Sequence, residues 1–271
     1  MGLEPLRVGR MAHFGRRSRV GRPSADRYSD PVPTRLPSLR RPPIAFAHRG
    51  ARAHAPENTL EAFELGLRLG ASGLESDVWL TADGVAVLDH DGQVGRRPRR
   101  TAIGRLDRAA LPSHVPTMDE LYAACGTDYE FSLDLKDPAA MPAVAAAAEQ
   151  AGGGAFERLW ICHHDLDVLA EWRSTWPTLR LVHSTFIGHM DGGPERHAAR
   201  LTELGIDAVN LHHTEWTGGF IALYHRFDRL AFAWDVQFDR VMIELLDTGI
   251  DALYSDHVDL LVTAIDRIIG D

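Results

Sequence analysis

The chain has 271 residues, of which 45% are hydrophobic and 25% charged, as in an ordinary folded domain rather than a fibrous or disordered chain. Its net charge of −9 disfavours nucleic acid and anionic membrane surfaces as partners. No apolar run reaches the roughly 18 residues of a membrane helix, and Cys125 and Cys162 lack metal-ligand spacing. Cys162 lies in an apolar run and is expected to be a buried free thiol. Without a secretion signal or stable membrane insertion, the expected compartment is cytoplasmic; the oligomeric state stays open.

The N-terminal segment differs in charge from the rest of the chain. Residues 1–43 hold ten Arg and three acidic residues, a net charge of +7, which leaves −9 − 7 = −16 for the remainder. The segment is rich in Pro and Ser and has no apolar periodicity, so it cannot bury enough surface to offset the entropy of ordering. We predict a disordered, dispensable arm over residues 1–43 and one domain over residues 44–271. An Arg-rich, acid-poor arm is also compatible with a transit-type peptide, although it lacks a clear amphipathic pattern.

From residue 44 onward, short apolar runs alternate with helical segments. Eight strands and eight helices in about 228 residues (271 − 43) predict an α/β fold of the TIM (β/α)₈ barrel type. An open doubly wound sheet is the alternative, but its usual glycine-rich turn after the first strand is replaced here by His48–Ala53. The expected strands are residues 44–47, 73–80, 129–136, 159–163, 179–184, 208–211, 230–236 and 252–255, with an extra strand at 85–88. The expected helices are residues 58–69, 118–124, 139–151, 165–175, 194–204, 219–227, 239–248 and 258–269.

Three carboxylates fall late in two consecutive barrel strands. Glu75 and Asp77 lie in the second strand, where residues two apart share a face, and Asp134 lies in the third. Active sites of TIM barrels lie at the carboxyl ends of the strands, so the three side chains would meet at one mouth. Hard divalent cations prefer oxygen ligands. The pattern therefore predicts a site for one Mg²⁺ or Ca²⁺ held by Glu75, Asp77 and Asp134.

Basic and aromatic side chains are expected at the same mouth. His48 follows the first strand and His90 follows the extra strand, and two histidines beside a metal can act as a general acid and a general base. Arg49 and Lys136 suit the oxygens of a bound phosphate. Trp234, near the end of the seventh strand, is expected to pack on the alcohol portion of a substrate, with a place in the hydrophobic core as the alternative. Together these residues predict hydrolysis of a phosphodiester in a small molecule.

The order of the motifs adds a family resemblance over residues 44–271. The sequence resembles the glycerophosphodiester phosphodiesterase family, which belongs to the phospholipase C-like phosphodiesterases with a TIM barrel. The motifs that carry the resemblance are His48-Arg49-Gly50, Pro56-Glu57-Asn58-Thr59, Glu75-x-Asp77, Asp83-Gly84, His90-Asp91, Val115–Leu121, Asp134-Leu135-Lys136, Trp234-Asp235-Val236 and Gly249–Asp256.

The resemblance implies a metal-dependent enzyme that cleaves glycerophosphodiesters to sn-glycerol 3-phosphate and an alcohol. It also implies that Glu57 and Asn58 lie near the site in a supporting role, and Asn58 stands where an N-cap would start a helix at Thr59. Asp134 stands where the family usually has Glu, and Gln237 where it often has Asn. The shorter Asp134 would draw the metal closer to the third strand.

Other functions remain open alternatives. A phospholipase D-like enzyme acting on lysophospholipids would be favoured by an apolar groove beside the barrel mouth. A non-catalytic phosphodiester-binding barrel would require the loss of His48, His90 or a carboxylate, and all are present. The pairs His163-His164 and His212-His213 would suit zinc, as in amidohydrolase barrels, but the His-x-His that those enzymes need on the first strand is missing. One histidine of each pair is instead expected to face the substrate.

Overall fold

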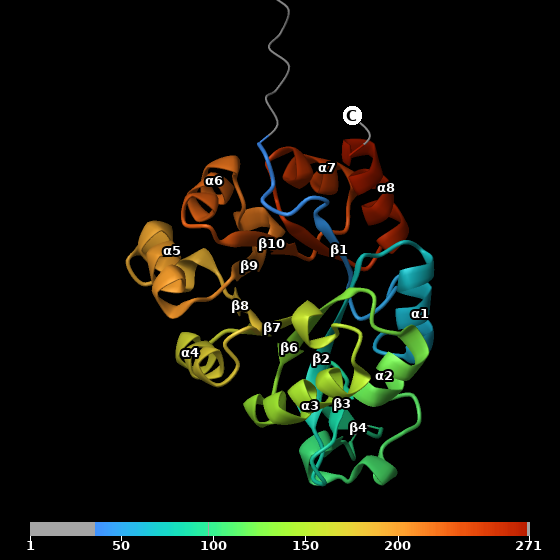
Figure 1. Ribbon diagram of the computed structural model, residues 1–271. Coiled ribbons are helices and arrows are strands. Elements are labelled where there is room, and N and C mark those ends of the chain that lie inside the picture. Colours follow the sequence, from blue (N-terminus) through green and yellow to red (C-terminus); the bar gives the residue numbers. More distant parts are fainter. Residues whose placement is uncertain (1–35, 97, 270–271) are drawn as a thin grey trace, which may run out of the picture. The chain divides into compact units, whose positions relative to one another are not determined.

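Eight parallel strands close into a barrel in the computed structural model, which describes residues 36–96 and 98–269 (Figure 1). The barrel closes because β1 pairs in parallel with both β2 and β11. The predicted TIM barrel is confirmed, and the open doubly wound sheet is wrong. In order around the barrel, the strands are β1 (Ile44–Ala47), β2 (Gly73–Leu80), β6 (Glu130–Leu135), β7 (Leu159–His163), β8 (Arg180–Ser184), β9 (Ala208–His212), β10 (Leu230–Trp234) and β11 (Ala252–Ser255).

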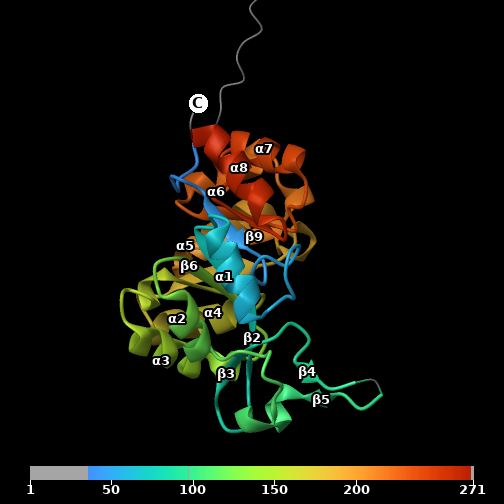
Figure 2. The ribbon, with the colours of Figure 1, turned by 90° about the vertical axis from the view of Figure 1, so that its right-hand side faces the viewer.

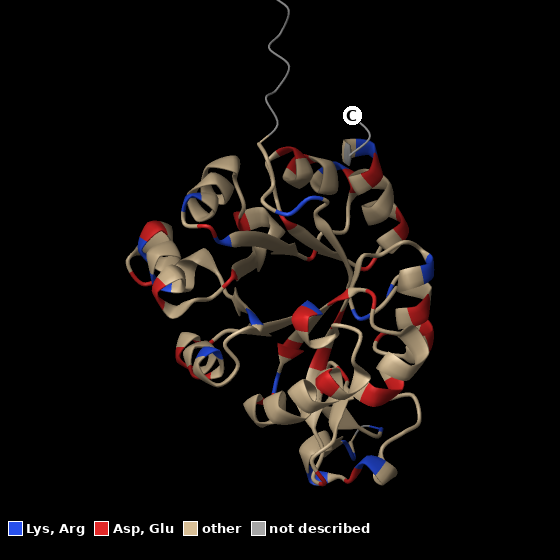
Figure 3. Cartoon of the chain, viewed as in Figure 1, with Lys and Arg blue, Asp and Glu red and all other residues tan. Residues whose placement is uncertain are grey.

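The helices surround the barrel (Figure 1), and several of them begin at local capping signals. Thr59 caps α1 by accepting from Ala62 N, and Thr117 forms a capping box with Glu120 at α2. Acidic residues are spread over α1, α2, α7 and α8 rather than gathered in one patch (Figure 3). The helices are α1 (Leu60–Arg68), α2 (Met118–Cys125), α3 (Met141–Ala151), α4 (Leu166–Thr175), α5 (Gly193–Leu204), α6 (Gly218–Arg226), α7 (Asp239–Asp247) and α8 (Val258–Ile269).

An excursion from the barrel follows β2. The short strand β3 (Ala86–Leu88) pairs antiparallel with the end of β2. It corresponds to the extra strand that the sequence predicts at residues 85–88. The hairpin β4 (Gln93–Val94) and β5 (Thr101–Ala102) then projects away from the barrel (Figure 2). The described connections also contain six short 3₁₀ helices: η1 (Ile103–Arg105), η2 (Arg108–Ala110), η3 (Pro138–Ala140), η4 (Phe156–Arg158), η5 (Ile187–His189) and η6 (His213–Glu215).

Large side chains fill the inside of the barrel below its carboxyl end. Phe46 stacks on Tyr254 with ring centroids 4.6 Å apart, and Phe232 contacts Trp160 at 5.1 Å. At the amino end, Glu130 accepts from Trp160 Nε1 and Arg180 Nη1, both at 2.7 Å, and also pairs with Arg40. The inside of the barrel is therefore a packed core, and the carboxyl end is where active sites of this fold lie.

Residues 36–43, which the sequence analysis assigned to the basic arm, contact the barrel. The fully buried Asp251 accepts three hydrogen bonds from this segment, from Ser38 Oγ (2.7 Å), Leu39 N (2.8 Å) and Arg40 N (3.1 Å). The other oxygen of Asp251 accepts from Ala231 N at 2.7 Å. The prediction of disorder is therefore wrong for residues 36–43, because the buried carboxylate of Asp251 accepts hydrogen bonds from this segment. The rest of the predicted arm, residues 1–35, lies outside the described residues.

Two further expectations concern the whole chain. Within residues 36–96 and 98–269, no helix combines the length and the apolar character that crossing a bilayer requires. Both cysteines are free thiols, and Cys162 is buried inside the barrel as predicted.

Candidate active site

A cavity of about 260 Å³ opens at the carboxyl ends of the barrel strands. The structure brings seven of the predicted site residues together there, because each ends a strand or follows it and faces inward. Its walls include residues that the sequence analysis did not single out, which come from the same inward-facing positions. The lining residues are His48, Arg49, Glu75, Asp77, Ser132, Asp134, Lys136, Cys162, Ser184, Asn210, Trp234 and Tyr254.

His48 is held between two carboxylates. Its Nδ1 lies 2.6 Å from Asp256 Oδ1, and its Nε2 lies 3.8 Å from Glu75 Oε2. Burial lowers the pKa of His48, but Glu75 and Asp256 outweigh it, so the net pKa is raised. Asp256 was missed as a functional partner; its only sequence signal is its position directly after β11 in the last motif. The arrangement fixes the imidazole and leaves Nε2 facing the cavity.

Glu75 and Asp77 lie side by side on the inner face of β2, only 7% and 2% exposed. Arg49 N donates to Glu75 Oε2 at 2.9 Å, and Arg49 Nε lies 3.2 Å from Asp77 Oδ2. Burial raises the pKa of Glu75 to about 7, with His48 and Arg49 lowering it and Asp77 raising it. A buried carboxyl group whose pKa is raised, such as Glu75, needs a nearby cation to ionise fully.

Lys136 supplies positive charge to this pair and to Asp134. Its Nζ lies 3.1 Å from Asp77 Oδ1 and also pairs with Asp134. Burial lowers the pKa of Lys136, but the nearby carboxylates of Asp134 and Asp77 raise it by more. The net pKa is raised, so the ammonium group stays charged. The ammonium therefore bridges two of the three predicted metal ligands.

The carboxylate oxygens of Glu75, Asp77 and Asp134 are of the type that binds a hard cation. Asp77 Oδ2 is buried and accepts no hydrogen bond within the described part of the chain, although it forms an ion pair with Arg49 Nε at 3.2 Å. The three predicted ligands do not converge as closely as a formed site would. The described residues contain two groups of three side chains whose ligand atoms all lie within 4.8 Å of one another, and neither includes Glu75, Asp77 or Asp134.

His90 does not line the cavity. It lies on the loop after β3, its side chain is 40% exposed, and Nδ1 lies 3.1 Å from Asp91 Oδ1. The loop starts next to the site, since Asp89 N donates to the backbone oxygen of Asp77 at 3.1 Å. The structure thus puts His90 near the mouth, on a segment whose direction strand periodicity does not determine.

Glu57 and Asn58 support Arg49 and β2 from behind. Glu57 accepts from Arg49 Nη1 at 3.3 Å, and Asn58 N donates to the backbone oxygen of Arg49 at 3.0 Å. Asn58 is buried with a φ of +54°, and its Oδ1 accepts from Ser76 Oγ at 2.7 Å. It does not cap α1, because Thr59 does. Neither side chain lines the cavity, which agrees with an indirect role.

Two of the remaining histidines lie at the edge of the site and one lies outside it. His212 contacts the ring of Trp234 at 4.6 Å, and with His213 and Asp235 it forms one of the two close ligand groups. His163 packs on Trp172 on the outer side of β7. None of the four histidines in these pairs lines the cavity, so the expectation that one member of each pair faces the substrate stays a prediction.

A larger hollow of about 1160 Å³ adjoins the cavity. Ser184 and Trp234 line both, so the two spaces meet at the carboxyl ends of β8 and β10. Its apolar lining includes Leu166 and Phe186, and Phe186 is 41% exposed. No sequence pattern indicated this hollow, because it is formed by loops and helices that meet only in the folded barrel.

Comparisons with known proteins agree with the fold and with the family resemblance of the sequence. The model of the Glycerophosphoryl diester phosphodiesterase family matches residues 48–260. YhdW of Bacillus subtilis is 24% identical over 80% of this chain and 96% of its own length. Human glycerophosphodiester phosphodiesterase 1 is 48% identical over 98 residues, but these are only 30% of each chain. The fold matches an Oleispira antarctica phosphodiesterase, solved with the product sn-glycerol-3-phosphate, with a TM-score of 0.72 at 22% identity over 83% of this chain and 97% of that one.

Proposed function

The chain belongs to the glycerophosphoryl diester phosphodiesterase family, and we propose that it hydrolyses small glycerophosphodiesters to sn-glycerol 3-phosphate and an alcohol. The observation that carries the proposal is the grouping of His48, Glu75 and Asp77 with Arg49 and Lys136 in one cavity at the barrel mouth. Cationic side chains for the phosphate, a proton-transfer group and carboxylates for a metal ion are the parts that phosphodiester hydrolysis requires.

Each side chain has a proposed task. Asp256 accepts a hydrogen bond from Nδ1–H of His48 and so keeps Nε2 available for proton transfer in the cavity. His48 and His90 act as the general acid and base, one toward the attacking oxygen and the other toward the leaving alkoxide. The attacking oxygen belongs to water or to the adjacent glycerol hydroxyl, which would give a cyclic phosphate first. Arg49 and Lys136 bind the phosphate oxygens, and Trp234 packs on the alcohol.

Glu75, Asp77 and Asp134 are the proposed ligands of one Mg²⁺ or Ca²⁺, which when bound would polarise a phosphoryl oxygen and offset the substrate's charge. The burial of Glu75 and Asp77 side by side supports this assignment, because buried carboxylates need positive charge nearby. When a phosphodiester and a cation enter, Lys136 can exchange its carboxylate partners for a phosphate oxygen. Its long side chain permits that exchange without a backbone movement.

The adjoining hollow supports a second candidate, hydrolysis of lysophospholipids. A space of about 1160 Å³ next to Trp234 is larger than a choline or ethanolamine group needs, and its walls include apolar side chains such as Leu166 and Phe186 among polar ones. A lysophospholipid could put its head group in the cavity and its chain in this hollow. The proposed compartment for either activity is the cytoplasm, which the two free cysteines support.

Product analysis on a matched panel tests both candidates. Purified protein is incubated with glycerophosphocholine, glycerophosphoethanolamine and lysophosphatidylcholine, each with Mg²⁺, Ca²⁺ or chelator. Release of glycerol 3-phosphate from the first two supports the main proposal, and release of lysophosphatidic acid supports the second. Turnover of every substrate by His48→Ala at the wild-type rate, or turnover that chelator leaves unchanged, would falsify the proposed mechanism. A Phe186→Ala variant should affect only the lysolipid.

A further inference from the structure

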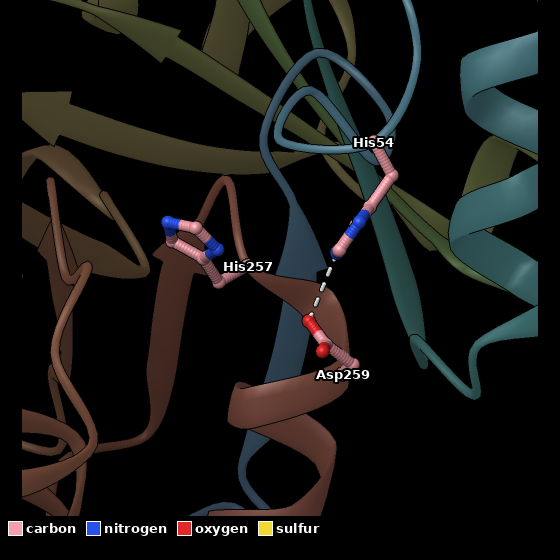
Figure 4. A group of neighbouring side chains, drawn as sticks. All are labelled: His54, His257 and Asp259. Carbon is pink, nitrogen blue, oxygen red and sulfur yellow. Dashed lines mark hydrogen bonds and ion pairs between the residues drawn. The ribbon is translucent and has the colours of Figure 1, made fainter.

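A second group of potential metal ligands lies at the rim of the barrel, outside the cavity. His54 comes from the loop between β1 and α1, whereas His257 and Asp259 come from the start of α8 (Figure 4). Nε2 of His54 lies 3.0 Å from Oδ1 of Asp259. One ligand atom from each of the three residues lies within 4.8 Å of the other two.

The backbone holds these residues on two supports, the loop between β1 and α1 and the start of α8. His257 N donates to Ser255 Oγ at 3.1 Å, and its carbonyl accepts from Leu261 N at 3.1 Å in the first turn of α8. Ala53 N donates to the backbone oxygen of Asp256 at 3.2 Å, which joins the two supports beside the ligands. The group therefore brings together side chains 205 positions apart in sequence on a frame that needs no large rearrangement.

The donor set differs in chemistry from the one in the cavity. Two imidazoles and one carboxylate are typical ligands of Zn²⁺ and similar transition ions, whereas the three ligands proposed in the cavity are all carboxylates. Ligand atoms on a tetrahedral zinc lie ~3.3 Å apart, as follows from metal–ligand distances of about 2.0–2.1 Å. The His54–Asp259 pair has nearly this spacing already. Rotation of the His257 side chain would bring in the third ligand.

The charges around the group permit a cation. The neighbouring Arg52 is engaged, since its Nε lies 2.5 Å from Glu57 Oε2 and its Nη1 lies 3.4 Å from Asp256 Oδ2. His54 and Asp259 are partly exposed, so an ion can enter from solvent and keep a water as fourth ligand.

We propose that His54, His257 and Asp259 form a binding site for Zn²⁺ or a similar divalent transition ion, separate from the cavity. The bound ion ties the β1–α1 loop to α8. Both supports adjoin Asp256, the residue that holds His48. Occupancy therefore stabilises the barrel closure around the His48–Asp256 pair. The other close group, His212, His213 and Asp235, adjoins Trp234 and is a competing zinc site that the test must separate.

Zinc titration of the full chain by calorimetry, paired with thermal unfolding, tests the site. His54→Ala and Asp259→Asn should each bind one equivalent fewer Zn²⁺ than wild type, and each should lose part of the zinc-dependent rise in Tm. His114→Ala is the matched control, because His114 is exposed and belongs to neither ligand group. A double variant, His212→Ala with His213→Ala, should retain the equivalent that His54→Ala loses.

Mg²⁺ should not reproduce the rise that depends on His54, because a hard cation has little preference for imidazole. Equal zinc stoichiometry in His54→Ala and His114→Ala, including no binding in either, would overturn the proposal. Loss of an equivalent in only one of the two ligand variants would overturn the three-ligand site as well.

Discussion

Asp256 Oδ1 and His48 Nδ1 lie 2.6 Å apart at the point where the first and last strands of the barrel meet. Asp256 also accepts from Arg52 Nη1 at 3.4 Å. Burial raises the pKa of Asp256, but the hydrogen bond and charge of His48 outweigh it, so the net pKa is lowered. The carboxylate is therefore ionised at neutral pH and can keep a proton on Nδ1 of His48.

Loss of this pair should change both the rate and its pH dependence. His48→Ala should lower kcat by ~10²–10⁴-fold, the usual contribution of general acid–base catalysis. Asp256→Asn removes a charge that raises the His48 pKa, so the limb of the kcat profile that reports His48 should move to lower pH. A full pH–rate profile of each variant measures this. An unmoved limb in Asp256→Asn, with kcat unchanged, would show that Asp256 does not act through His48.

Metal binding should depend on the carboxylates of β2. Glu75→Gln and Asp77→Asn should each abolish both the Mg²⁺-dependent activity and the rise in Tm on adding Mg²⁺, because a ligand that binds only the native state stabilises it by mass action. Thermal unfolding at several Mg²⁺ concentrations provides the readout. Glu64→Gln, on the exposed face of α1, is the control and should respond like wild type. If Asp77→Asn keeps the full Tm response, the proposed ligand set is incorrect.

Asp134 tests the third ligand. Asp134→Glu keeps the charge and adds a methylene, so it should retain measurable activity while changing the preference between Mg²⁺ and Ca²⁺, since Mg²⁺ demands tighter geometry. Asp134→Asn should be much worse, because it removes charge from the cation and from Lys136. Rates measured with each metal compare the two variants. Equal activity of Asn and Glu, with an unchanged metal constant, would make Asp134 a partner of Lys136 alone.

Asp251 should contribute strongly to stability. It is fully buried and accepts from Ser38, Leu39, Arg40 and Ala231, so Asp251→Ala leaves several buried donors unsatisfied. Breaking such a buried charged network costs about 3–5 kcal/mol of unfolding free energy. Denaturant titration measures it. Ser38→Ala, the milder control, should cost about 1 kcal/mol. A loss below that of Ser38→Ala would mean that residues 36–43 are not held by Asp251.

A chain of buried histidines predicts a loss of stability in mild acid. His183 Nε2 donates to the backbone oxygen of His164 (3.0 Å), its Nδ1 accepts from His197 Nε2 (2.8 Å), and His197 Nδ1 lies 2.9 Å from Tyr224 OH. Burial lowers the pKa of both His183 and His197 to about 4. The charges of His164 and His163 lower the pKa of His183 further, and that of His183 lowers the pKa of His197 further.

The sign of the effect follows from proton binding. Between about pH 6.5 and 4 the unfolded chain binds protons at these positions and the folded chain does not, so the unfolding free energy falls as the pH falls through this window. The loss should be on the order of a few kcal/mol, since one pKa unit is about 1.4 kcal/mol. Denaturant titrations at several pH values measure it for wild type and His197→Gln. The variant should show a shallower pH dependence, and an identical slope would contradict the assignment.

Local patterns predicted the barrel and most of the cavity. Each strand has a side-chain period of two and ends at the same mouth, so a sequence position late in a strand also gives a position at the site. That is why Glu75, Asp77 and Asp134 were found on the cavity wall. His90 was less well determined, because it lies on a loop whose direction no periodicity fixes.

Contacts between distant parts of the chain could not be predicted in this way. The docking of residues 36–43 depends on the carboxylate of Asp251, more than 200 positions away. Composition alone therefore suggested disorder up to residue 43. The pairing of His183 with His197 is equally hidden, since each looks like an isolated histidine in sequence.

The pairing of β1 with β11 also has a consequence for the order in which the protein is made. β1 leaves the ribosome first and must wait for β11, so an incomplete chain exposes an unpaired strand edge, which is prone to aggregate. The same delay applies to chemistry, because His48 meets Asp256 across 208 positions. A chain that stops before β11 lacks both the closing strand and the partner of His48. Incomplete chains that leave the ribosome early are therefore expected to have no hydrolase activity.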